Sequence, residues 1–428
     1  MRILDMRTSR REVLALARRE WVNDPVIEAK VREIVDHVRK EGDEAVTTYT
    51  RQLDCGLIDS LGLLVPAREV DAACRRVAPG VRKALKIAKR NIERFHRRQL
   101  PKSWTLKSPG RKLQHRVTPL ERVGIYIPGG KAAYPSTVLM NAIPAVIAGV
   151  KEIVMTTPCS REGKISPEVL AAARECGISE IYRIGGAQAV AALAYGTESI
   201  RRVDKITGPG NAYVAAAKQM LYGTVGIDVI AGPTEVVIVA DAQARPDFIA
   251  ADLIAQAEHD ERAVPICITT EARLAGAICA ELDRQLVSAP RRDIARRALD
   301  QQGVIVQVSS LKEAADLVND LAPEHLEVLL KNPDAFASKV KHAGSIFLGN
   351  WSTEALGDYA AGPNHTLPTS GTARFSSPLG VLDFIKFSNV ITFSKKEFER
   401  LADTVEALAR VEGLHGHAAS VAIRRGRR

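Results

Sequence analysis

Residues 246–260, PDFIAADLIAQAEHD, carry a glutamine and a histidine at a spacing that could bind a metal ion or a substrate. The segment has the apolar periodicity of a helix, with Pro246 as a start signal and Asp247 as the candidate N-cap. On its polar side, Gln256 and His259 are three residues apart, so the amide and the imidazole project from neighbouring positions of one rigid element. A solvated polar face has the same spacing, so the pattern alone leaves both interpretations open.

Glu324 and His325 form a second candidate, in the string APEHLEVLL. Pro323 restricts the backbone before them, and the apolar run 326–330 predicts a strand, so both residues stand at a strand's start. A neighbouring carboxylic acid and imidazole can divide proton transfer between a substrate and a water molecule. An adjacent glutamate and histidine also occur as ordinary surface residues.

Two further donors lie later in the chain. Asp358, in the glycine-flanked string LGDYAAGPNH, offers a carboxylate oxygen, and His417, in VEGLHGH, offers a nitrogen near the end of the last predicted helix. With Gln256 and His259 they make two nitrogen and two oxygen donors, a set that zinc accepts. Because residues 256 and 417 are far apart in the chain, spacing cannot establish that the four meet.

Three glycine-rich turns are candidates for a dinucleotide site: IPGGKAAYPS (127–136), IGGAQAV (184–190) and TGPGNAYV (207–214). Glycine lets backbone amides approach an anionic group, and the following helix N-terminus adds the positive end of its dipole. Each turn follows the carboxyl end of a predicted parallel strand, where open α/β sheets bind ligands. None is a complete fingerprint, since Gly208 and Gly210 are followed by Tyr213 in place of a third glycine. Close packing of a helix on a sheet also requires glycine.

The elements that must position these residues begin with helices and continue with a βα alternation. The first hundred residues read as helices, one of them opened by Asp24 and Pro25 and closed at Gly42. From about residue 112, short β-branched runs alternate with helical patterns, which predicts parallel sheets covered on both faces. The predicted strands are 122–127, 152–157, 180–184, 203–207 and 227–230, and, after the AGPT turn at 231–234, 235–240, 266–270, 304–308, 326–330 and 344–349. A proline-rich loop, a strand-like segment 381–393 and one last helix end the chain.

The composition is that of a globular protein of two to four domains, with 428 residues, 46% of them hydrophobic and 26% charged. A net charge of +10 suits an anionic small molecule, a nucleic acid or merely a basic surface, but only 5% of the residues are aromatic. Because base stacking needs aromatic side chains, we expect no nucleic-acid partner.

Neither the opening MRILDMRTSRREVL nor the most apolar segment, 136–150, has the pattern of a signal peptide or the length of a membrane span. The six cysteines include no C-x-x-C pair, which favours reduced thiols. We therefore expect a cytoplasmic protein without a membrane partner.

Eight long strings extend over practically the entire chain, in this order: RVGIYIPGGKAAYPSTVLMNAIPAVIAGV, IGGAQAVAALAYGT, KITGPGNAYVAAAK, DVIAGPTEV, DLIAQAEHD, LAPEHLEV, LGDYAAGPNHTLPTSGTARFSSPLGV and EGLHGHAASVAIR. Together and in this order they resemble histidinol dehydrogenases. The resemblance implies an NAD-dependent zinc enzyme that oxidises L-histidinol through bound L-histidinal to L-histidine, reducing two NAD⁺, in the final steps of L-histidine biosynthesis. The alternative is a relative on the same scaffold that oxidises another small alcohol, although the presence of His365 and Glu412 argues against it.

Carried over position by position, the resemblance implies one zinc ion per subunit with the ligands Gln256, His259, Asp358 and His417. It implies Glu324 and His325 as the acid/base pair, and NAD⁺ contacts from Tyr126, Gln188 and Asn211. The implied substrate contacts are Thr234, Gln256, His259, His325, Asp358, His365, Glu412 and His417. Position 234 is Thr, whereas Ser is frequent at this position of the GPTEV turn in the family. His415 is an alternative metal ligand to His417, but the E-G-L-x-x-H register favours His417.

The resemblance also implies a homodimer in which the C-terminal appendage of one chain completes the site of the other, with Glu412 and His417 acting across the interface. The expected fold is α/β, with two Rossmann-like parallel-sheet domains, a helical N-terminal extension and a small C-terminal appendage. The expected boundaries are 1–23 for the extension, 24–122 with 235–379 for the zinc and substrate domain, 123–234 for the NAD-binding domain and 380–428 for the appendage.

Overall fold

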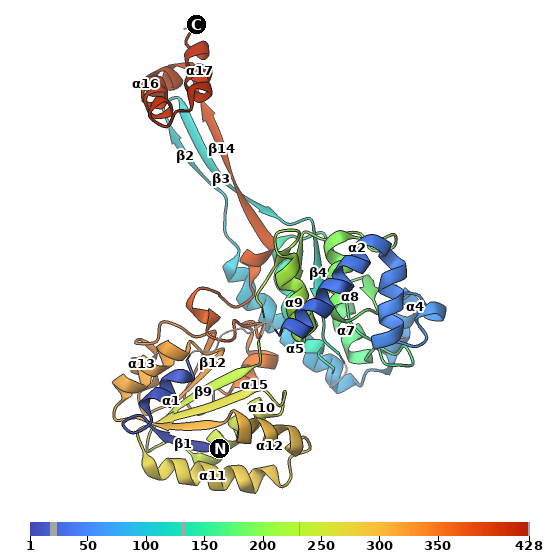
Figure 1. Ribbon diagram of the computed structural model, residues 1–428, viewed down its shortest axis with the longest axis vertical. Coiled ribbons are helices and arrows are strands. Elements are labelled where there is room, and N and C mark those ends of the chain that lie inside the picture. Colours follow the sequence, from blue (N-terminus) through green and yellow to red (C-terminus); the bar gives the residue numbers. More distant parts are fainter. Residues whose placement is uncertain (18–23, 130–132, 231, 427–428) are drawn as a thin grey trace. The chain divides into compact units, whose positions relative to one another are not determined.

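The computed structural model describes residues 1–17, 24–129, 133–230 and 232–426. The chain divides into two compact units (Figure 1), Met1–Gln99 with Leu120–Phe384 and Leu100–Pro119 with Ile385–Arg428. The first unit contains two parallel sheets and the second contains one antiparallel sheet, which confirms the α/β fold class. Among the described helices, none combines the length and the apolar character needed to cross a membrane.

The first parallel sheet has the strand order β6–β5–β4–β7–β8. Its strands are β4 (Arg122–Tyr126), β5 (Glu152–Thr156), β6 (Glu180–Tyr182), β7 (Lys205–Thr207) and β8 (Gly226–Ile227). The chain starts at the centre, runs outward to β6 and then continues on the other side of β4, so the connections diverge between β4 and β7. In such doubly wound sheets, ligands bind at this divergence, beyond the carboxyl ends of the strands.

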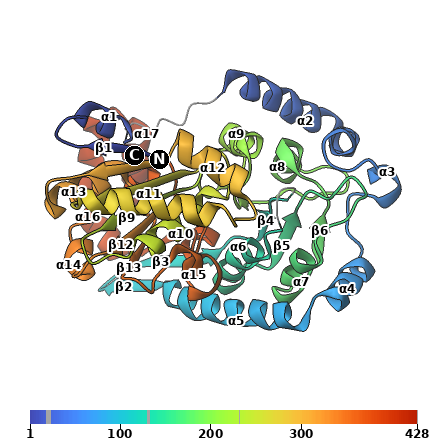
Figure 2. The same cartoon turned by 90° about the horizontal axis from the view of Figure 1, so that it is seen from below.

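Helices cover both faces of this sheet (Figure 2). One face carries α2 (Pro25–Leu53), α8 (Gly186–Tyr195) and α9 (Ala212–Leu221), and the other carries α4 (Ala67–Arg76), α5 (Pro79–His96), α6 (Pro135–Ala148) and α7 (Pro167–Glu175), while α3 (Ile58–Leu61) follows α2. This packing corrects the expectation that residues 24–122 share a domain with 235–379, because Val31 and Val38 of α2 are buried with Ala189 of α8. An apolar stripe shows that a helix needs a partner, but not which sheet supplies it.

The second parallel sheet repeats the same winding, in the order β1–β11–β10–β9–β12–β13. Its strands are β9 (Glu235–Ala240), β10 (Val264–Thr269), β11 (Val304–Gln307), β12 (His325–Leu329) and β13 (Ser345–Leu348), with β1 (Arg2–Asp5) added at the edge beside β11. One face carries α10 (Pro246–Ala257), α11 (Ala272–Leu286) and α12 (Arg292–Gln301), and the other α1 (Arg10–Ala15), α13 (Leu311–Leu321) and α14 (Pro333–Ala337). The sequence analysis predicted only helix before residue 24 and therefore missed β1.

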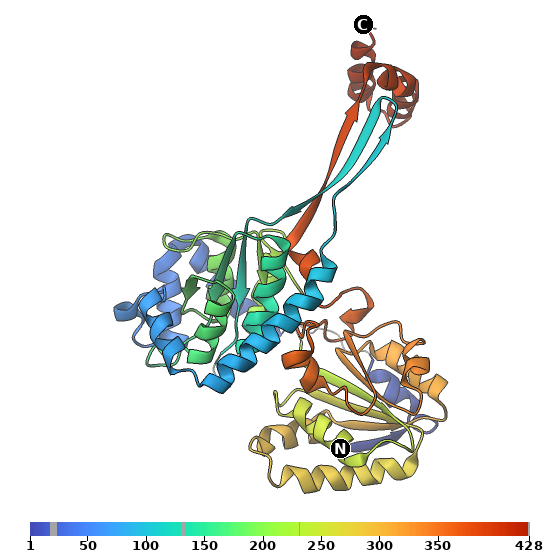
Figure 3. The ribbon, with the colours of Figure 1, turned by 180° about the vertical axis from the view of Figure 1, so that it is seen from behind.

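The second unit is a three-stranded antiparallel ribbon that carries two helices (Figure 3). Its elements are β2 (Trp104–Ser108), β3 (Arg111–Pro119), β14 (Ile385–Phe393), α16 (Lys395–Val411) and α17 (His415–Arg424). Residues 100–119 thus join the C-terminal segment, which the expected boundary at 380 did not include. The single last helix of the sequence analysis is two helices, because the chain breaks at Gly413, which has φ +72°.

Two predicted helix boundaries differ from the structure. Arg245, with extended backbone angles, is the N-cap of α10, and the Asp247 carboxylate instead accepts a hydrogen bond from the Arg245 guanidinium at 3.0 Å. Gly42 interrupts α2 with φ 53° but does not end it. The predicted start of α2 is confirmed at Asp24, whose carboxylate accepts from the Val26 N–H.

Candidate active site

The predicted metal and acid/base residues of the first unit gather at the amino-terminal edge of the second sheet. Thr234 directly precedes β9, and His325 is the first residue of β12, which pairs with β9. Helix α10 ends at the same place, with Gln256 in its last turn and His259 just beyond it. Because the C-terminal end of a helix carries partial negative charge, this edge favours a cation.

A chain of polar contacts links α10 to Glu324. The Gln256 amide lies 2.7 Å from Thr234 Oγ1, with its oxygen facing Thr234 and the Glu235 N–H and its nitrogen facing the Glu354 carboxylate, and Thr234 Oγ1 lies 2.7 Å from Glu324 Oε2. The backbone N–H of Glu235 donates to the same carboxylate oxygen at 2.9 Å. Burial raises the pKa of Glu324, and the hydrogen bond from Thr234 acts against that rise. The chain holds the carboxyl group at the start of β12 in one orientation.

His325 has one ring nitrogen available for proton transfer. Its Nδ1 lies 3.1 Å from the Glu235 carbonyl oxygen and is the N–H donor there, which leaves Nε2 as the proton acceptor. Within the described residues, Nε2 has no hydrogen-bond partner, and it lies 3.8 Å from Asp358 Oδ1. Burial lowers the pKa of His325 to about 4, so the ring is neutral near pH 7.

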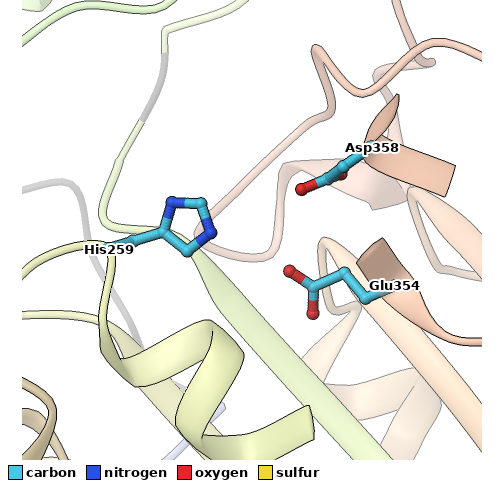
Figure 4. Close-up of side chains that lie close together, drawn as sticks. All are labelled: His259, Glu354 and Asp358. Atoms are coloured by element: carbon cyan, nitrogen blue, oxygen red, sulfur yellow. The ribbon is translucent and has the colours of Figure 1, made fainter. Parts of the chain in front are cut away.

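Three potential metal ligands surround this histidine. His259, Glu354 and Asp358 each offer one ligand atom, and these atoms lie within 4.8 Å of one another (Figure 4). Glu354 begins the short helix α15 (Glu354–Leu356), and Asp358 lies in the turn η2 (Gly357–Ala361) that follows it. The structure therefore brings together the predicted donors His259 and Asp358, with Gln256 hydrogen-bonded to Thr234 beside them.

Glu354 was not singled out by the sequence analysis. It is 4% exposed, and burial among other carboxylates raises its pKa. The only sequence signal for it is its spacing of four from Asp358, which places two carboxylates on one side of a helical turn.

His365 is hydrogen-bonded to the loop that contains Asp358. Its Nδ1 donates to the Asp358 carbonyl oxygen at 2.9 Å, and its Nε2 lies 3.4 Å from Thr137 Oγ1. His325, Asp358 and His365 line a cavity of about 900 Å³, large enough for a small-molecule substrate.

The residues predicted to contact NAD⁺ lie at the carboxyl ends of the first sheet. Tyr126 ends β4, and its hydroxyl accepts from the Gly186 N–H at 3.1 Å. Gln188 is buried in α8, where its amide nitrogen donates to Asp54 at 3.3 Å and its Oε1 has no partner within the described residues. Asn211 caps α9 by accepting from the Tyr213 N–H at 3.0 Å. All three stand on or beside glycine-rich turns, and their contact with a cofactor stays a prediction.

Glu412 and His417 belong to the second unit. Glu412 follows α16, His417 lies in α17, and both side chains are exposed. Their contribution to the site of a partner chain stays a prediction.

Comparisons with known proteins identify the family of this chain. The sequence model of the histidinol dehydrogenase family matches residues 17–425. The histidinol dehydrogenase of Synechococcus sp. is 50% identical over 93% of this chain and 92% of that protein, and the histidinol dehydrogenase of Moorella thermoacetica is 51% identical over 93% of this chain and 94% of that protein. The crystal structure of histidinol dehydrogenase from Elizabethkingia anophelis has 37% identity and a TM-score of 0.93, covering 100% of this chain and 98% of that one. The chain belongs to the histidinol dehydrogenase family and shares its oxidoreductase class.

Proposed function

We propose that this chain oxidises L-histidinol through bound L-histidinal to L-histidine, the last steps of histidine biosynthesis, with one zinc ion per subunit and two NAD⁺ per turnover. The observation that carries the proposal is the position of His325, a buried neutral imidazole whose Nε2 has no partner within the described residues and lies 3.8 Å from Asp358 Oδ1. A proton acceptor beside a cluster of metal donors is the arrangement that alcohol oxidation needs.

The donor set suits zinc. The ion would be held by Gln256, His259 and Asp358 of one chain together with His417 of the partner subunit. Imidazole nitrogens and amide or carboxylate oxygens are donor atoms that zinc accepts. A bound zinc ion supplies positioning for the imidazole and amino nitrogens of histidinol.

The two oxidations use the same histidine. His325 Nε2 takes the hydroxyl proton of histidinol as a hydride leaves the carbinol carbon, and the bound aldehyde results. Glu324 then takes a proton from a water molecule whose oxygen adds to the aldehyde carbon, while His325 returns its proton to the carbonyl oxygen, so that a gem-diol forms and His325 is neutral again. From the resulting gem-diol His325 again takes a hydroxyl proton while the second hydride leaves, and the carboxylic acid forms. Retention in the 900 Å³ cavity keeps the reactive aldehyde from being lost.

The turns of the first sheet suit a dinucleotide. A bound NAD⁺ accepts the hydride in each oxidation. Gly208 has φ +114°, and a side chain there would collide with the Tyr126 carbonyl oxygen, so the turn before α9 is kept free of side-chain bulk. Tyr126, Gln188 and Asn211 would contact the cofactor from this edge.

The assembly that we propose is a homodimer with exchange of the C-terminal appendage. Glu412 and His417 are exposed in the second unit, where a partner chain would use them. Large apolar side chains of this unit are exposed as well, and a partner would bury them: Leu106, Phe387, Ile391, Val411 and Ile423. The free thiols of all six cysteines accord with a cytoplasmic location.

Product analysis tests the proposed reaction. Incubation with L-histidinol and NAD⁺ is expected to yield L-histidine, identified by chromatography, whereas a panel of polyols yields no NADH. Equal rates with polyols would instead favour a relative of the family with a different small-alcohol substrate.

A further inference from the structure

The Asp54 carboxylate lies at the end of α2 and contacts the glycine-rich turn 184–190. Asp54 is the C-cap of α2, and its backbone N–H donates to the Thr50 carbonyl oxygen at 2.9 Å. Its Oδ2 accepts the Gly185 N–H at 3.2 Å and the Gln188 amide nitrogen at 3.3 Å. One carboxylate oxygen thus joins the backbone of the turn and a side chain of the first turn of α8 to a helix that lies far from them in the chain.

This contact fixes the orientation of the Gln188 amide. An ionised carboxylate offers only acceptors, so the amide nitrogen of Gln188 faces Asp54 and the amide oxygen faces away from it. Gln188 is 0% exposed, and its Oε1 has no hydrogen-bond partner within the described residues. A buried acceptor without a donor costs free energy, and a ligand that supplies the donor removes this cost. Asp54 therefore holds a ready acceptor in the turn.

The two glycines of the turn leave the space that these side chains occupy. Gly186 has φ +62°, and a Cβ on it would lie 2.5 Å from Gln188 Oε1. A Cβ on Gly185 would lie 3.0 Å from Asp54 Oδ2. The Gly186 N–H donates to the Tyr126 hydroxyl oxygen at 3.1 Å, so two consecutive N–H groups of the turn are taken by Asp54 and Tyr126. The turn is thereby held between two side chains.

The position is unfavourable for a negative charge. Burial raises the pKa of Asp54, while the hydrogen bond from the Gly185 N–H and the charge of Arg161 act in the opposite direction. The C-terminal end of a helix also carries partial negative charge, which disfavours a carboxylate at the end of α2. A carboxyl group kept under two such conditions beside a candidate ligand site indicates a role in that site.

We propose that Asp54 is a positioning residue for the cofactor, which holds the turn and the Gln188 amide so that Gln188 Oε1 accepts a hydrogen bond from bound NAD⁺. The donor on NAD⁺ is a ribose hydroxyl or the carboxamide N–H. The inference rests on the proposed function in taking Gln188 as an NAD⁺ contact. Asp54 acts on cofactor binding through Gln188 and takes no part in the proton transfer at His325.

Direct NAD⁺ binding tests this role, measured by calorimetric titration of the full chain without L-histidinol. In Asp54→Ala the Kd for NAD⁺ is expected to rise about tenfold, because Gln188 then also adopts orientations that do not bind. Asp54→Asn is expected to restore most of the affinity, since its amide oxygen can accept both hydrogen bonds that Oδ2 now accepts. Asp59→Ala is the matched control and is expected to leave the Kd unchanged, because Asp59 is exposed and pairs with Arg51 near the same end of α2.

Two further measurements distinguish positioning from a general loss of structure. Hydrogen–deuterium exchange of the segment 184–190, without cofactor, is expected to be faster in Asp54→Ala than in the unchanged protein, because the Gly185 N–H loses its acceptor. Asp59→Ala is expected to exchange like the unchanged protein. In steady-state assays of Asp54→Ala the KM for NAD⁺ is expected to rise, while the KM for L-histidinol stays the same.

The outcomes separate this inference from the proposed function. A Kd for NAD⁺ in Asp54→Ala equal to that of the unchanged protein would overturn the inference and leave the proposed oxidation standing. An unchanged protein that neither binds NAD⁺ nor forms NADH from L-histidinol would overturn both. Should Asp54→Ala fail to fold, Asp54→Glu decides, because it keeps the charge but displaces the oxygens by one methylene: a raised Kd for NAD⁺ supports the inference, and an equal Kd overturns it.

Discussion

Nε2 of His325 lies 3.8 Å from Oδ1 of Asp358 and has no hydrogen-bond partner within the described residues. The other ring nitrogen, Nδ1, donates a hydrogen bond to the Glu235 carbonyl oxygen at 3.1 Å, and this bond fixes the orientation of the ring. The proposed proton acceptor is thereby held beside a proposed metal ligand, so a substrate bound to the ion would present its hydroxyl group to this nitrogen.

Replacing His325 by asparagine is expected to lower kcat about 10²–10⁴-fold, because the general base is lost. Metal content, measured by atomic absorption, is expected to stay the same, since His325 is not among the proposed ligands. His342→Asn makes the same substitution close to the start of β13 and is expected to retain activity. Near-normal NADH production by His325→Asn would refute the assigned role.

Replacing Glu324 by glutamine is expected to slow the second oxidation more than the first, because the carboxylate is proposed to activate water for the aldehyde. Glutamine can still accept the hydrogen bond that Thr234 now gives to the carboxylate at 2.7 Å, so the local structure should survive. Single-turnover experiments would detect about one NADH per histidinol and an aldehyde that a hydrazine reagent traps. An unchanged yield of both NADH equivalents would contradict the assignment.

A buried ion pair under the turn before α9 is expected to contribute to stability and to cofactor binding. The Lys218 ammonium pairs with Asp228 and donates to the Gly208 carbonyl oxygen at 3.0 Å, while Asp228 accepts the Gly208 N–H at 2.8 Å. Lys218→Met leaves a carboxylate buried and unpaired, which should cost about 3–5 kcal/mol in urea unfolding and raise the KM for NAD⁺. The double variant Lys218→Met with Asp228→Leu should regain most of the stability. A loss below about 1 kcal/mol in the single variant would count against the pair.

His96 is expected to make stability fall on acidification. The residue is 0% exposed, its Nδ1 donates to the Ile92 carbonyl oxygen at 2.9 Å, and burial lowers its pKa below the ordinary 6.5. Above pH 6.5 the His96 ring is neutral in both the folded and the unfolded states. Below pH 6.5 the unfolded state protonates this ring before the folded state does. The free energy of unfolding therefore declines as the pH falls, until the pKa of His96 in the folded state is reached.

The change is at most about 1.4 kcal/mol per pH unit. Urea unfolding at pH 7.5 and 5.5 should show a smaller decline in His96→Gln, which does not titrate, than in the unchanged protein. Identical declines would mean that His96 does not couple to folding.

Parts of this fold could be predicted because buried parallel strands are continuous apolar runs. The run 235–240 coincides with β9, and β12 begins one residue before the predicted strand 326–330. The ribbon of the second unit could not be predicted in the same way, since β3 pairs with β14 across more than 250 residues of sequence and both strands mix polar with apolar side chains. Local pattern carries no information about such distant pairing.

The candidate site was predictable to a similar extent. The spacing of Gln256 and His259 on one helix, and of Glu324 with His325 at a strand start, is visible in the sequence. The role of Thr234 as the bridge between Gln256 and Glu324 depends on the register of β9 with β12, and only the fold supplies it. Glu354 could not be predicted from the sequence either, because its neighbours in space, Gln256 of α10 and His325 of β12, are distant in the chain.

The most direct test of the account measures the NADH formed per L-histidinol consumed, before and after removal of the metal with a chelator. Two NADH per histidinol, lost on chelation and restored by Zn²⁺, is the expected result. A yield of one NADH, or a yield of two that survives complete metal removal, would contradict a zinc-dependent double oxidation at this site.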